Sequence, residues 1–257
     1  MLPTLPRPII FAHRGASAHA PENTMAAFTL AIRQGANALE LDAKLTSDGH
    51  VVVFHDQGVD RVTAGSGRVK DMKLAALREL EAGSHFSPKF TGEPIPTLDE
   101  VLQTVGNQTY INIELTNYTS LFDPLPEKVA ELVHRYNLEK RVLFSSFNPI
   151  ALRRIHRIIP DVPLGFLARP ATQGNTARGY LGKLIVPYQA LHPHFTDTTR
   201  HLVEQLHRAG RRVHVWTVNQ VEEMKRLFEL DIDGIFTDDP LLAQNVMKGC
   251  NKDDPGS

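Results

Sequence analysis

The sequence predicts an α/β protein built as a (β/α)8 TIM barrel. Short apolar runs alternate with amphipathic stretches along the whole chain, and eight of the runs resemble buried strands. A length of 257 residues suits one barrel of this kind. The main alternative, an open doubly wound sheet, usually has fewer strands and an early glycine-rich phosphate loop that this sequence lacks. We therefore expect a single barrel domain over residues 1–257.

The strands and helices are expected to alternate in chain order. The predicted strands are Ile9–His13, Ala38–Lys44, Tyr110–Leu115, Arg141–Ser145, Pro163–Ala168, Tyr188–His192, Arg212–Thr217 and Gly234–Thr237. The predicted helices are Thr24–Gln34, Pro126–Tyr136, Pro149–Ile159, roughly Asn175–Leu184, Thr198–Ala209 and Val221–Leu230. Gly35 and Gly210 lie where helix C-caps fall, and Asn219 is expected to cap the last of these helices.

An insertion is predicted after the second strand. About 65 residues separate the second predicted strand from the third, against about 20–40 between the others. Ser47–Gly49 is a turn signal between two apolar runs, of which His50–His55 is the second, and it predicts a hairpin. Thr97 and Glu100 have the spacing of a capping box at the start of a further helix. We expect the segment at about 46–96 to form a small cap over the barrel mouth.

Composition excludes some classes of partner. The net charge is −1, from 28 basic and 29 acidic residues, which gives no electrostatic case for binding nucleic acid. No run of 18 or more apolar residues predicts a membrane span. Cys250 is the only cysteine, so an intrachain disulfide is excluded. With no apolar signal core before the first strand, we expect a cytoplasmic protein. The oligomeric state stays open.

Three carboxylates are placed to meet at the ends of two neighbouring strands. Glu40 and Asp42 are two residues apart on one strand and therefore point to the same face. Glu114 lies at the end of the next barrel strand. An all-oxygen set favours a hard divalent ion, Mg²⁺ or Ca²⁺. The alternative is that each is a solvated or salt-bridged carboxylate.

Two histidines and an arginine lie near the same strand ends. His13 ends the first strand, and His55 ends the returning arm of the hairpin, so the pair can act as general base and general acid. Arg14 offers a planar cation for a phosphate or carboxylate. Trp216 is the only tryptophan, and it either walls a substrate pocket or fills the barrel.

The sequence resembles the glycerophosphodiester phosphodiesterases. The resemblance depends on an ordered set of motifs over about residues 9–240 and not on any one of them. The motifs are His13–Gly15, Pro21–Thr24, Glu40–Asp42, Phe54–Asp56, Phe86–Leu98, Asn112–Glu114, Phe144–Phe147, Val215–Asn219 and Asp233–Asp238.

The resemblance implies a metal-dependent hydrolase on a barrel with a small insertion. Such enzymes cleave a glycerophosphodiester, a small-molecule substrate, to glycerol 3-phosphate and an alcohol. By resemblance, Glu40, Asp42 and Glu114 would bind the metal. His13 and His55 would form the acid–base pair, and Arg14 would contact the phosphate.

One position departs from the family pattern. The third carboxylate is usually followed by a lysine, as Glu-x-Lys, whereas this sequence has Thr116 two residues after Glu114. Thr116 shares the face of Glu114 and is expected to touch the substrate through its hydroxyl, without a charge. Four residues near later strand ends are candidates to supply the charge: Arg169, Lys183, His192 and His194.

Two other functions remain open. A lysophospholipase D-like enzyme of the same superfamily would act on a diester that keeps an acyl chain, and an apolar face around Phe86 and Phe90 would favour it. A non-catalytic phosphate- or headgroup-binding barrel is the alternative from another class. The reason to consider it is Thr116, which replaces the lysine usual in the family.

Overall fold

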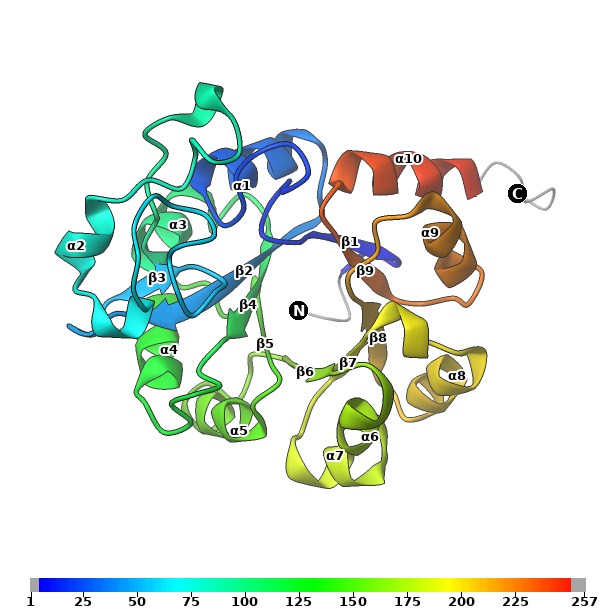
Figure 1. Cartoon of the computed structure of the whole chain (residues 1–257). Coiled ribbons are helices and arrows are strands. Elements are labelled where there is room, and N and C mark those ends of the chain that lie inside the picture. The colour runs from blue at the N-terminus through cyan, green and yellow to red at the C-terminus, as the bar shows by residue number, and fades with distance from the viewer. Residues whose placement is uncertain (1–4, 251–257) are drawn as a thin grey trace.

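Eight parallel strands close into a barrel in the structure, which is a computed structural model. The structure describes residues 5–250, apart from the side chains of residues 180, 181, 183 and 250. The order is β1–β9–β8–β7–β6–β5–β4–β2, and β1 pairs with β2 to close the ring. A ninth strand, β3, pairs antiparallel with β2. Figure 1 shows the strands at the centre and the helices around them. The predicted fold class is confirmed.

The strands are short and almost entirely buried, and each barrel strand begins and ends within two residues of its predicted bounds. They are β1 Ile9–Ala12, β2 Ala38–Leu45, β3 Val51–Val53, β4 Tyr110–Leu115, β5 Val142–Ser146, β6 Leu164–Ala168, β7 Ala190–Pro193, β8 Arg212–Val215 and β9 Gly234–Thr237.

The helices cover the outside of the barrel. They are α1 Met25–Arg33, α2 Leu74–Arg78, α3 Leu98–Val105, α4 Leu125–Arg135, α5 Pro149–Ile158, α6 Asn175–Arg178, α7 Tyr180–Ile185, α8 Arg200–Arg208, α9 Val221–Phe228 and α10 Pro240–Cys250. Short 3-10 turns occur at Val69–Asp71, Pro88–Phe90, Ala171–Gly174 and Phe195–Asp197. The capping box at Thr97 and Glu100 is present at the start of α3.

Two helix predictions need correction. The single helix expected at about Asn175–Leu184 is interrupted, because Gly179 has an extended backbone and separates α6 from α7. The N-cap position of α9 is Gln220 and not Asn219. The Asn219 side chain is instead bonded to Asp238, accepting from its backbone N–H and donating to its carboxylate.

Alternation along β2 separates the core from the site. Leu39, Leu41 and Ala43 point outward and pack in the main hydrophobic core beneath the helices. Glu40 and Asp42 point inward, so they lie inside the ring toward the carboxyl end of β2. The lower part of the barrel interior is apolar, with a cluster made of Leu5, Ile9, Phe11, Ala38, Leu143, Ala190 and Phe236. The polar groups therefore collect at one end of the barrel.

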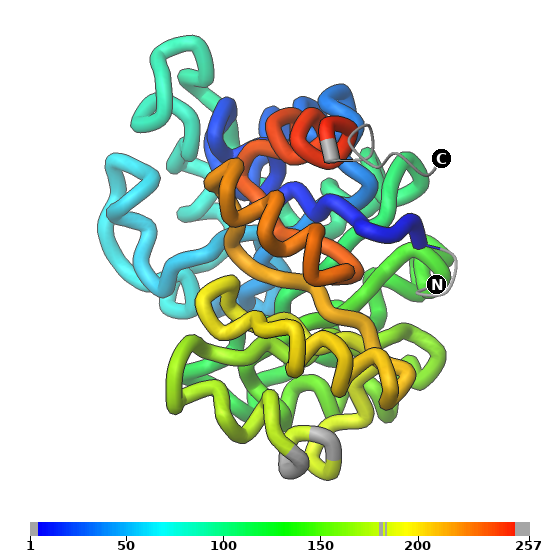
Figure 2. Tube along the Cα trace, turned by 90° about the vertical axis from the view of Figure 1, so that its right-hand side faces the viewer, coloured from blue at the N-terminus to red at the C-terminus, as the bar shows by residue number. Residues whose placement is uncertain are grey.

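The chain between β2 and α3 forms the predicted hairpin and a small outlying cluster. Residues Val51–Val53 pair antiparallel with β2, and Gly49 in the turn has φ +80°, a conformation that favours glycine. The segment has its own apolar cluster: Val52, Phe54, Val59, Val62, Val69, Leu77, Ala82 and Ile95. Figures 1 and 2 show it beside β2, to one side of the barrel. A role as a cap over the mouth stays a prediction.

Among residues 5–250, no helix is both long enough and apolar enough to cross a lipid bilayer.

Two histidines lie inside the barrel. His192 and His214 are fully buried, with Nε2 of the first 3.1 Å from Nδ1 of the second. A Cβ on Gly165 would lie 2.2 Å from His192, so the neighbouring strand needs glycine there. Burial lowers the pKa of His192 to about 3. Burial and the nearby His192 also lower the pKa of His214. Both rings are therefore neutral in the folded protein.

The buried pair of His192 and His214 predicts that the folded protein loses stability in acid. Because both folded-state pKa values lie below the ordinary value of about 6.5, the unfolded chain binds more protons, and stability falls as pH drops below about 6.5. Between pH 8 and pH 5, unfolding free energy should fall by about 2 kcal/mol or more relative to a variant with leucine at both positions. Urea unfolding in EDTA measures both proteins. Parallel pH profiles would contradict the assignment.

Candidate active site

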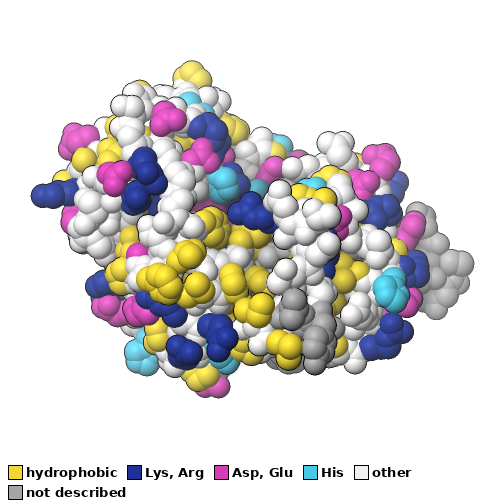
Figure 3. All heavy atoms as spheres, turned by 60° about the horizontal axis from the view of Figure 1, so that its bottom comes forward, with side chains coloured by type: hydrophobic (Ala, Val, Ile, Leu, Met, Phe, Trp, Pro, Cys, Tyr) yellow, Lys and Arg dark blue, Asp and Glu magenta, His cyan; other side chains and the backbone are white. Residues whose placement is uncertain are grey.

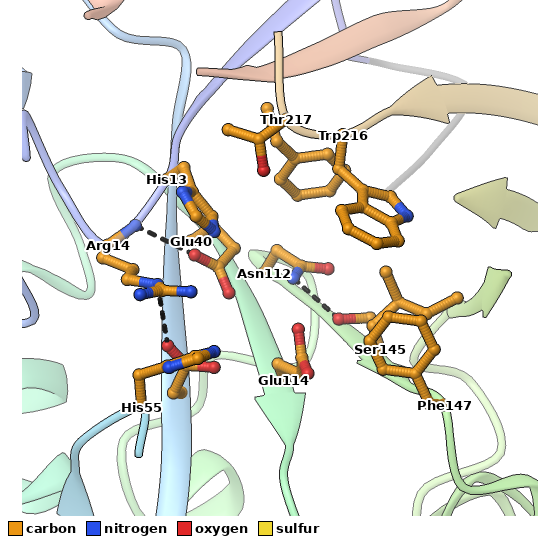
Figure 4. Close-up of a pocket in the computed structure, with 13 residues that line it drawn as sticks. His13, Arg14, Glu40, His55, Asn112, Glu114, Ser145, Phe147, Trp216 and Thr217 are labelled. Carbon is orange, nitrogen blue, oxygen red and sulfur yellow. Dashed lines mark hydrogen bonds and ion pairs between the residues drawn. The ribbon is translucent and has the colours of Figure 1, made fainter. Parts of the chain in front are cut away.

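A cavity of about 100 Å³ opens where the carboxyl ends of the barrel strands meet. It is lined by His13, Arg14, Glu40, Asp42, His55, Asn112, Glu114, Ser145, Phe147, Leu167, Trp216, Thr217 and Phe236. These include every site residue predicted from the sequence except Thr116. Figure 4 shows how their side chains converge from separate strands and from the start of the inserted segment.

The three predicted carboxylates form one cluster, in which Glu40 and Asp42 are buried and Glu114 is half-buried. Parallel pairing places Asp42 opposite Glu114, and one ligand oxygen from each of Glu40, Asp42 and Glu114 lies within 4.8 Å of the others. Burial raises the pKa of Glu114 to about 8, and the charge of Asp42 adds to the effect. Burial and the other two carboxylates raise the pKa of Glu40 well above its usual range. The three groups therefore cannot all be ionised here without a nearby positive charge.

Asp42 is the carboxylate that the protein itself stabilises. Burial opposes its ionisation, but the charges of Arg14 and His55 and a hydrogen bond from Asn23 hold its pKa below the usual value. The amide of Asn23 donates to Asp42 over 2.9 Å. Glu40 and Glu114 receive less compensation from the protein, so they are the groups that most need a cation.

The residues present fit a hard divalent cation. The cluster offers only oxygen atoms, and Asn112, which also lines the cavity, has a buried Oδ1 with no hydrogen-bond partner among the described residues. Such an oxygen-rich site suits Mg²⁺ or Ca²⁺ better than a soft metal. The side-chain hydroxyl of Tyr118 donates to Glu114 and fixes one of its oxygens.

His13 is held by a carboxylate from the far end of the chain. Its Nδ1 lies 2.7 Å from Oδ1 of Asp238, which follows β9. Asp238 also accepts hydrogen bonds from Ser17 and Asn219, at 3.1 and 2.6 Å. The Nε2 atom of His13 is thus the ring nitrogen left for the cavity.

His55 has a similar arrangement. Its Nδ1 lies 2.6 Å from Asp56, and Arg61 donates from Nε to the other oxygen of Asp56 over 2.5 Å. The two Nη atoms of Arg61 donate to both oxygens of Glu22, at 2.9 and 2.6 Å. Arg61 therefore ties the inserted segment, and with it His55, to the loop after β1. The sequence carried a signal for Asp56, which directly follows His55, but no role was predicted for it.

Arg14 occupies a strained turn beside the carboxylates. Its φ is +57°, and its backbone N–H donates to Glu40 over 2.9 Å. Its guanidinium donates to Glu22 over 3.1 Å, and Nε lies 3.5 Å from Asp42. A Cβ on Gly15 would lie 2.7 Å from Ala27, so only glycine fits the turn after Arg14. This backbone path brings both the amide and the side chain of Arg14 to the cluster.

An aromatic wall faces the carboxylates. Trp216 donates from Nε1 to the carbonyl of His192 over 2.8 Å, and its ring meets Phe147 edge-on at 5.5 Å. Tyr118 packs on Phe147 at 5.8 Å, and Arg169 lies over the same ring at 4.8 Å. Trp216 therefore lines the cavity while its body packs against the barrel interior.

The chain is similar to known phosphodiesterases over nearly its whole length. The sequence pattern of the Glycerophosphoryl diester phosphodiesterase family matches residues 13–242. A glycerophosphodiester phosphodiesterase from Caldanaerobacter subterraneus is 39% identical, with 93% of this chain and 98% of that protein covered. The chain belongs to the glycerophosphodiester phosphodiesterase family.

Solved structures agree with this membership. A phosphodiesterase from Oleispira antarctica, solved with the product sn-glycerol-3-phosphate, is 31% identical, with a TM-score of 0.83 over 94% of this chain and 97% of that one. A glycerophosphodiester phosphodiesterase from Agrobacterium tumefaciens is 28% identical, with a TM-score of 0.80 over 92% of this chain and 99% of that one.

Thr116, which stands where the family usually has a lysine, does not lie where the sequence predicted. Thr116 lines a neighbouring cavity and not the one with His13. Of the residues expected to replace the missing lysine charge, His192 is inside the barrel, while Arg169 and His194 pack on the aromatic wall. The Lys183 side chain lies outside the described part of the chain.

The cation beside Thr116 is Lys44. Its Nζ donates to the Thr116 hydroxyl over 2.9 Å. Burial lowers the pKa of Lys44, whereas Asp42 and Glu114 oppose this shift. Lys44 was not among the predicted site residues, although it follows Asp42 by two residues and so shares the inward face of β2.

The hydrogen bonds of Arg61 predict that His55 depends on this arginine for its position. We expect Arg61→Gln to lower kcat on a glycerophosphodiester about 10- to 100-fold, with KM little changed, because His55 and Asp56 lose their anchor. Arg61→Lys should not restore kcat, since an ammonium cannot bind both Asp56 and the two oxygens of Glu22. Steady-state kinetics measure both.

The matched control is Arg68→Gln. Arg68 is an exposed arginine of the same segment whose ion pair with Asp71 is long, at 4.0 Å. Its removal should leave kcat unchanged. An equal loss in both variants would mean that Arg61 acts only through the general charge of the segment.

The carboxylate cluster predicts a cation-dependent stability. Because the pKa of Glu114 is raised to about 8 from about 4.5, the folded protein without a cation loses stability as pH rises through that interval. At pH 8, Glu114→Gln should therefore raise the melting temperature in EDTA. The wild type should gain about 5 °C or more with saturating Mg²⁺ or Ca²⁺. The variant should gain much less.

Thermal unfolding with and without the cation measures both effects, and Glu79→Gln, an exposed carboxylate of the inserted segment, is the control. If Glu114→Gln responded to the cation as the wild type does, the cluster would not be the binding site.

Proposed function

We propose that this chain hydrolyses glycerophosphodiesters to sn-glycerol 3-phosphate and an alcohol, with Mg²⁺ or Ca²⁺ bound by Glu40, Asp42 and Glu114. The observation that carries the proposal is the placement of two histidines, each with its own aspartate on Nδ1, at one cavity with this cluster. Family membership and the product complex of the Oleispira relative support it.

The binding groups suit an anionic phosphodiester. When bound, the divalent cation would neutralise charge that builds on the phosphoryl oxygens. Arg14 presents a guanidinium held by Glu22 and is the protein cation lining the cavity. Phe147 and Trp216 offer an apolar wall against which the carbon skeleton of the glycerol can pack.

The two histidines divide the proton transfers. One accepts the proton of the nucleophile at Nε2, and the other donates from Nε2 to the departing alkoxide. Asp238 and Asp56, on the Nδ1 atoms of His13 and His55, keep each ring oriented and stabilise its protonated form. The nucleophile is either water or the neighbouring glycerol hydroxyl. Attack by the hydroxyl would pass through a cyclic phosphate.

One observation favours a lysophospholipid as a second substrate class. The loop between β4 and α4, which follows Glu114 and contains Tyr118, exposes Leu121 and Phe122, the latter to 76%. Figure 3 shows hydrophobic side chains gathered at the middle of one face beside histidine and basic side chains. Such a surface suits an acyl chain that stays outside the cavity. Phe86, on the inserted segment, is also exposed, whereas Phe90 is half-buried.

The acid–base assignment predicts that His13→Ala and His55→Ala each lower kcat at least about 10³-fold without unfolding the protein. Both side chains lie at the cavity and contribute little to the core, so the melting temperature should stay near that of the wild type. Release of sn-glycerol 3-phosphate from glycerophosphocholine measures kcat.

His19→Ala and His50→Ala are matched controls. Both are exposed histidines, one on the loop of His13 and the other in the hairpin that leads to His55, and neither lines the cavity. Their kcat should be unchanged. Near-normal turnover by the His13 variant would overturn the assignment. If the wild type releases no product from several diesters with either cation, a phosphate-binding barrel without activity is favoured. Lysophosphatidylcholine assayed in parallel tests whether lysophospholipids are a second substrate class.

A further inference from the structure

Lys44 is a buried lysine one step beyond the carboxylate cluster. It follows Asp42 by two residues on β2, as Thr116 follows Glu114 on β4, and Asp42 is paired with Glu114. The two residues therefore continue the row of inward side chains toward the barrel mouth. Lys44 is only 5% exposed and Thr116 only 2%.

Thr116 orients the Lys44 side chain but accepts only one of the three hydrogen bonds that its ammonium can donate. The Thr116 hydroxyl donates its hydrogen to the carbonyl of Ala43 over 2.7 Å, so toward Lys44 it can only accept, at 2.9 Å. An ammonium group has three donors. Thr116 is its one hydrogen-bond acceptor among the described residues, which leaves two donors for a ligand.

Lys44 is also reachable. Together with Thr116 it lines a cavity of about 380 Å³ between the hairpin of the inserted segment and the loop after β4. The wall includes Gln57 from the inserted segment and Asn117 and Ser120 from the loop. The charges of Asp42 and Glu114 act on Lys44, so its ammonium lies near the carboxylates where the phosphate is expected to bind.

The charges around Lys44 explain its burial only in part, because its ammonium favours ionised Asp42 and Glu114 but donates no hydrogen bond to either among the described residues. Removing an ammonium from water is unfavourable unless it is well paired, and an apolar side chain would fill the same space at lower cost. Thr116 has its own hydrogen bond to Ala43 and does not need the lysine. An ammonium with unused hydrogen-bond donors beside the expected phosphate position is suited to bind that phosphate.

We propose that Lys44 contacts the phosphate of the substrate, and that it supplies from β2 the charge that a lysine at position 116 would supply from β4. The inference rests on the proposed function, since it concerns the same phosphodiester. Lys44 would stabilise negative charge on the phosphoryl oxygens as the leaving group departs, while Thr116 fixes the direction of its side chain.

The test compares Lys44→Met with Lys73→Met. Lys73 is exposed at the start of α2 and lies outside the cavity, so its loss should change nothing. With glycerophosphocholine and Mg²⁺, Lys44→Met should lower kcat/KM about 10²-fold. Its affinity for sn-glycerol 3-phosphate, measured by calorimetry, should fall about 10-fold. Thermal unfolding establishes that both variants are folded.

A charge swap separates contact with the phosphate from a structural role. Lys44→Thr combined with Thr116→Lys moves the ammonium to the neighbouring strand, and it should recover most of the kcat/KM and product affinity that Lys44→Thr alone loses. Unchanged kcat/KM and product affinity in Lys44→Met would overturn the inference and leave the proposed function intact. A loss that the swap fails to recover would also overturn it. If the wild type turns over no diester, the proposed function fails, and the product affinities alone then decide the role of Lys44.

Discussion

The constraint on which the site depends is the repulsion among three carboxylates gathered toward the ends of β2 and β4. In a medium that screens charge poorly, such groups cannot all ionise without nearby positive charge. The protein supplies part of it, because the turn at Arg14 directs both an amide and a guanidinium at the cluster. The remainder suits a divalent cation. The glycine after Arg14 and the left-handed backbone of Arg14 follow from this requirement.

The barrel brings the proton-transfer groups to the cluster from distant parts of the chain. Pairing of β1 with β9 places Asp238 beside His13, although the two are 225 residues apart. His55 arrives on the returning arm of a hairpin, and Arg61 fastens it to the loop after β1. Each histidine thus depends on a different long-range contact. A small change in either contact would disturb one proton transfer without affecting the carboxylates.

The sequence predicted the barrel, the hairpin and most of the site because these depend on local patterns. Strand ends and two-residue spacing were enough to bring Glu40 and Asp42 to one face. They were not enough to find Asp238, whose contact with His13 exists only after the ring closes. Lys44 was missed for another reason. Its spacing was visible, but only the register of β2 and β4 shows that it lies beside Thr116.

The proposed function requires this cluster to hold a cation beside the bound phosphate. A crystal structure determined with Mn²⁺ in place of Mg²⁺, and with sn-glycerol 3-phosphate, tests it most directly, since anomalous scattering locates the ion. We expect one ion among Glu40, Asp42 and Glu114, with the phosphate in contact with Arg14 and Lys44. An ion bound elsewhere, or a phosphate bound away from these carboxylates, would contradict it.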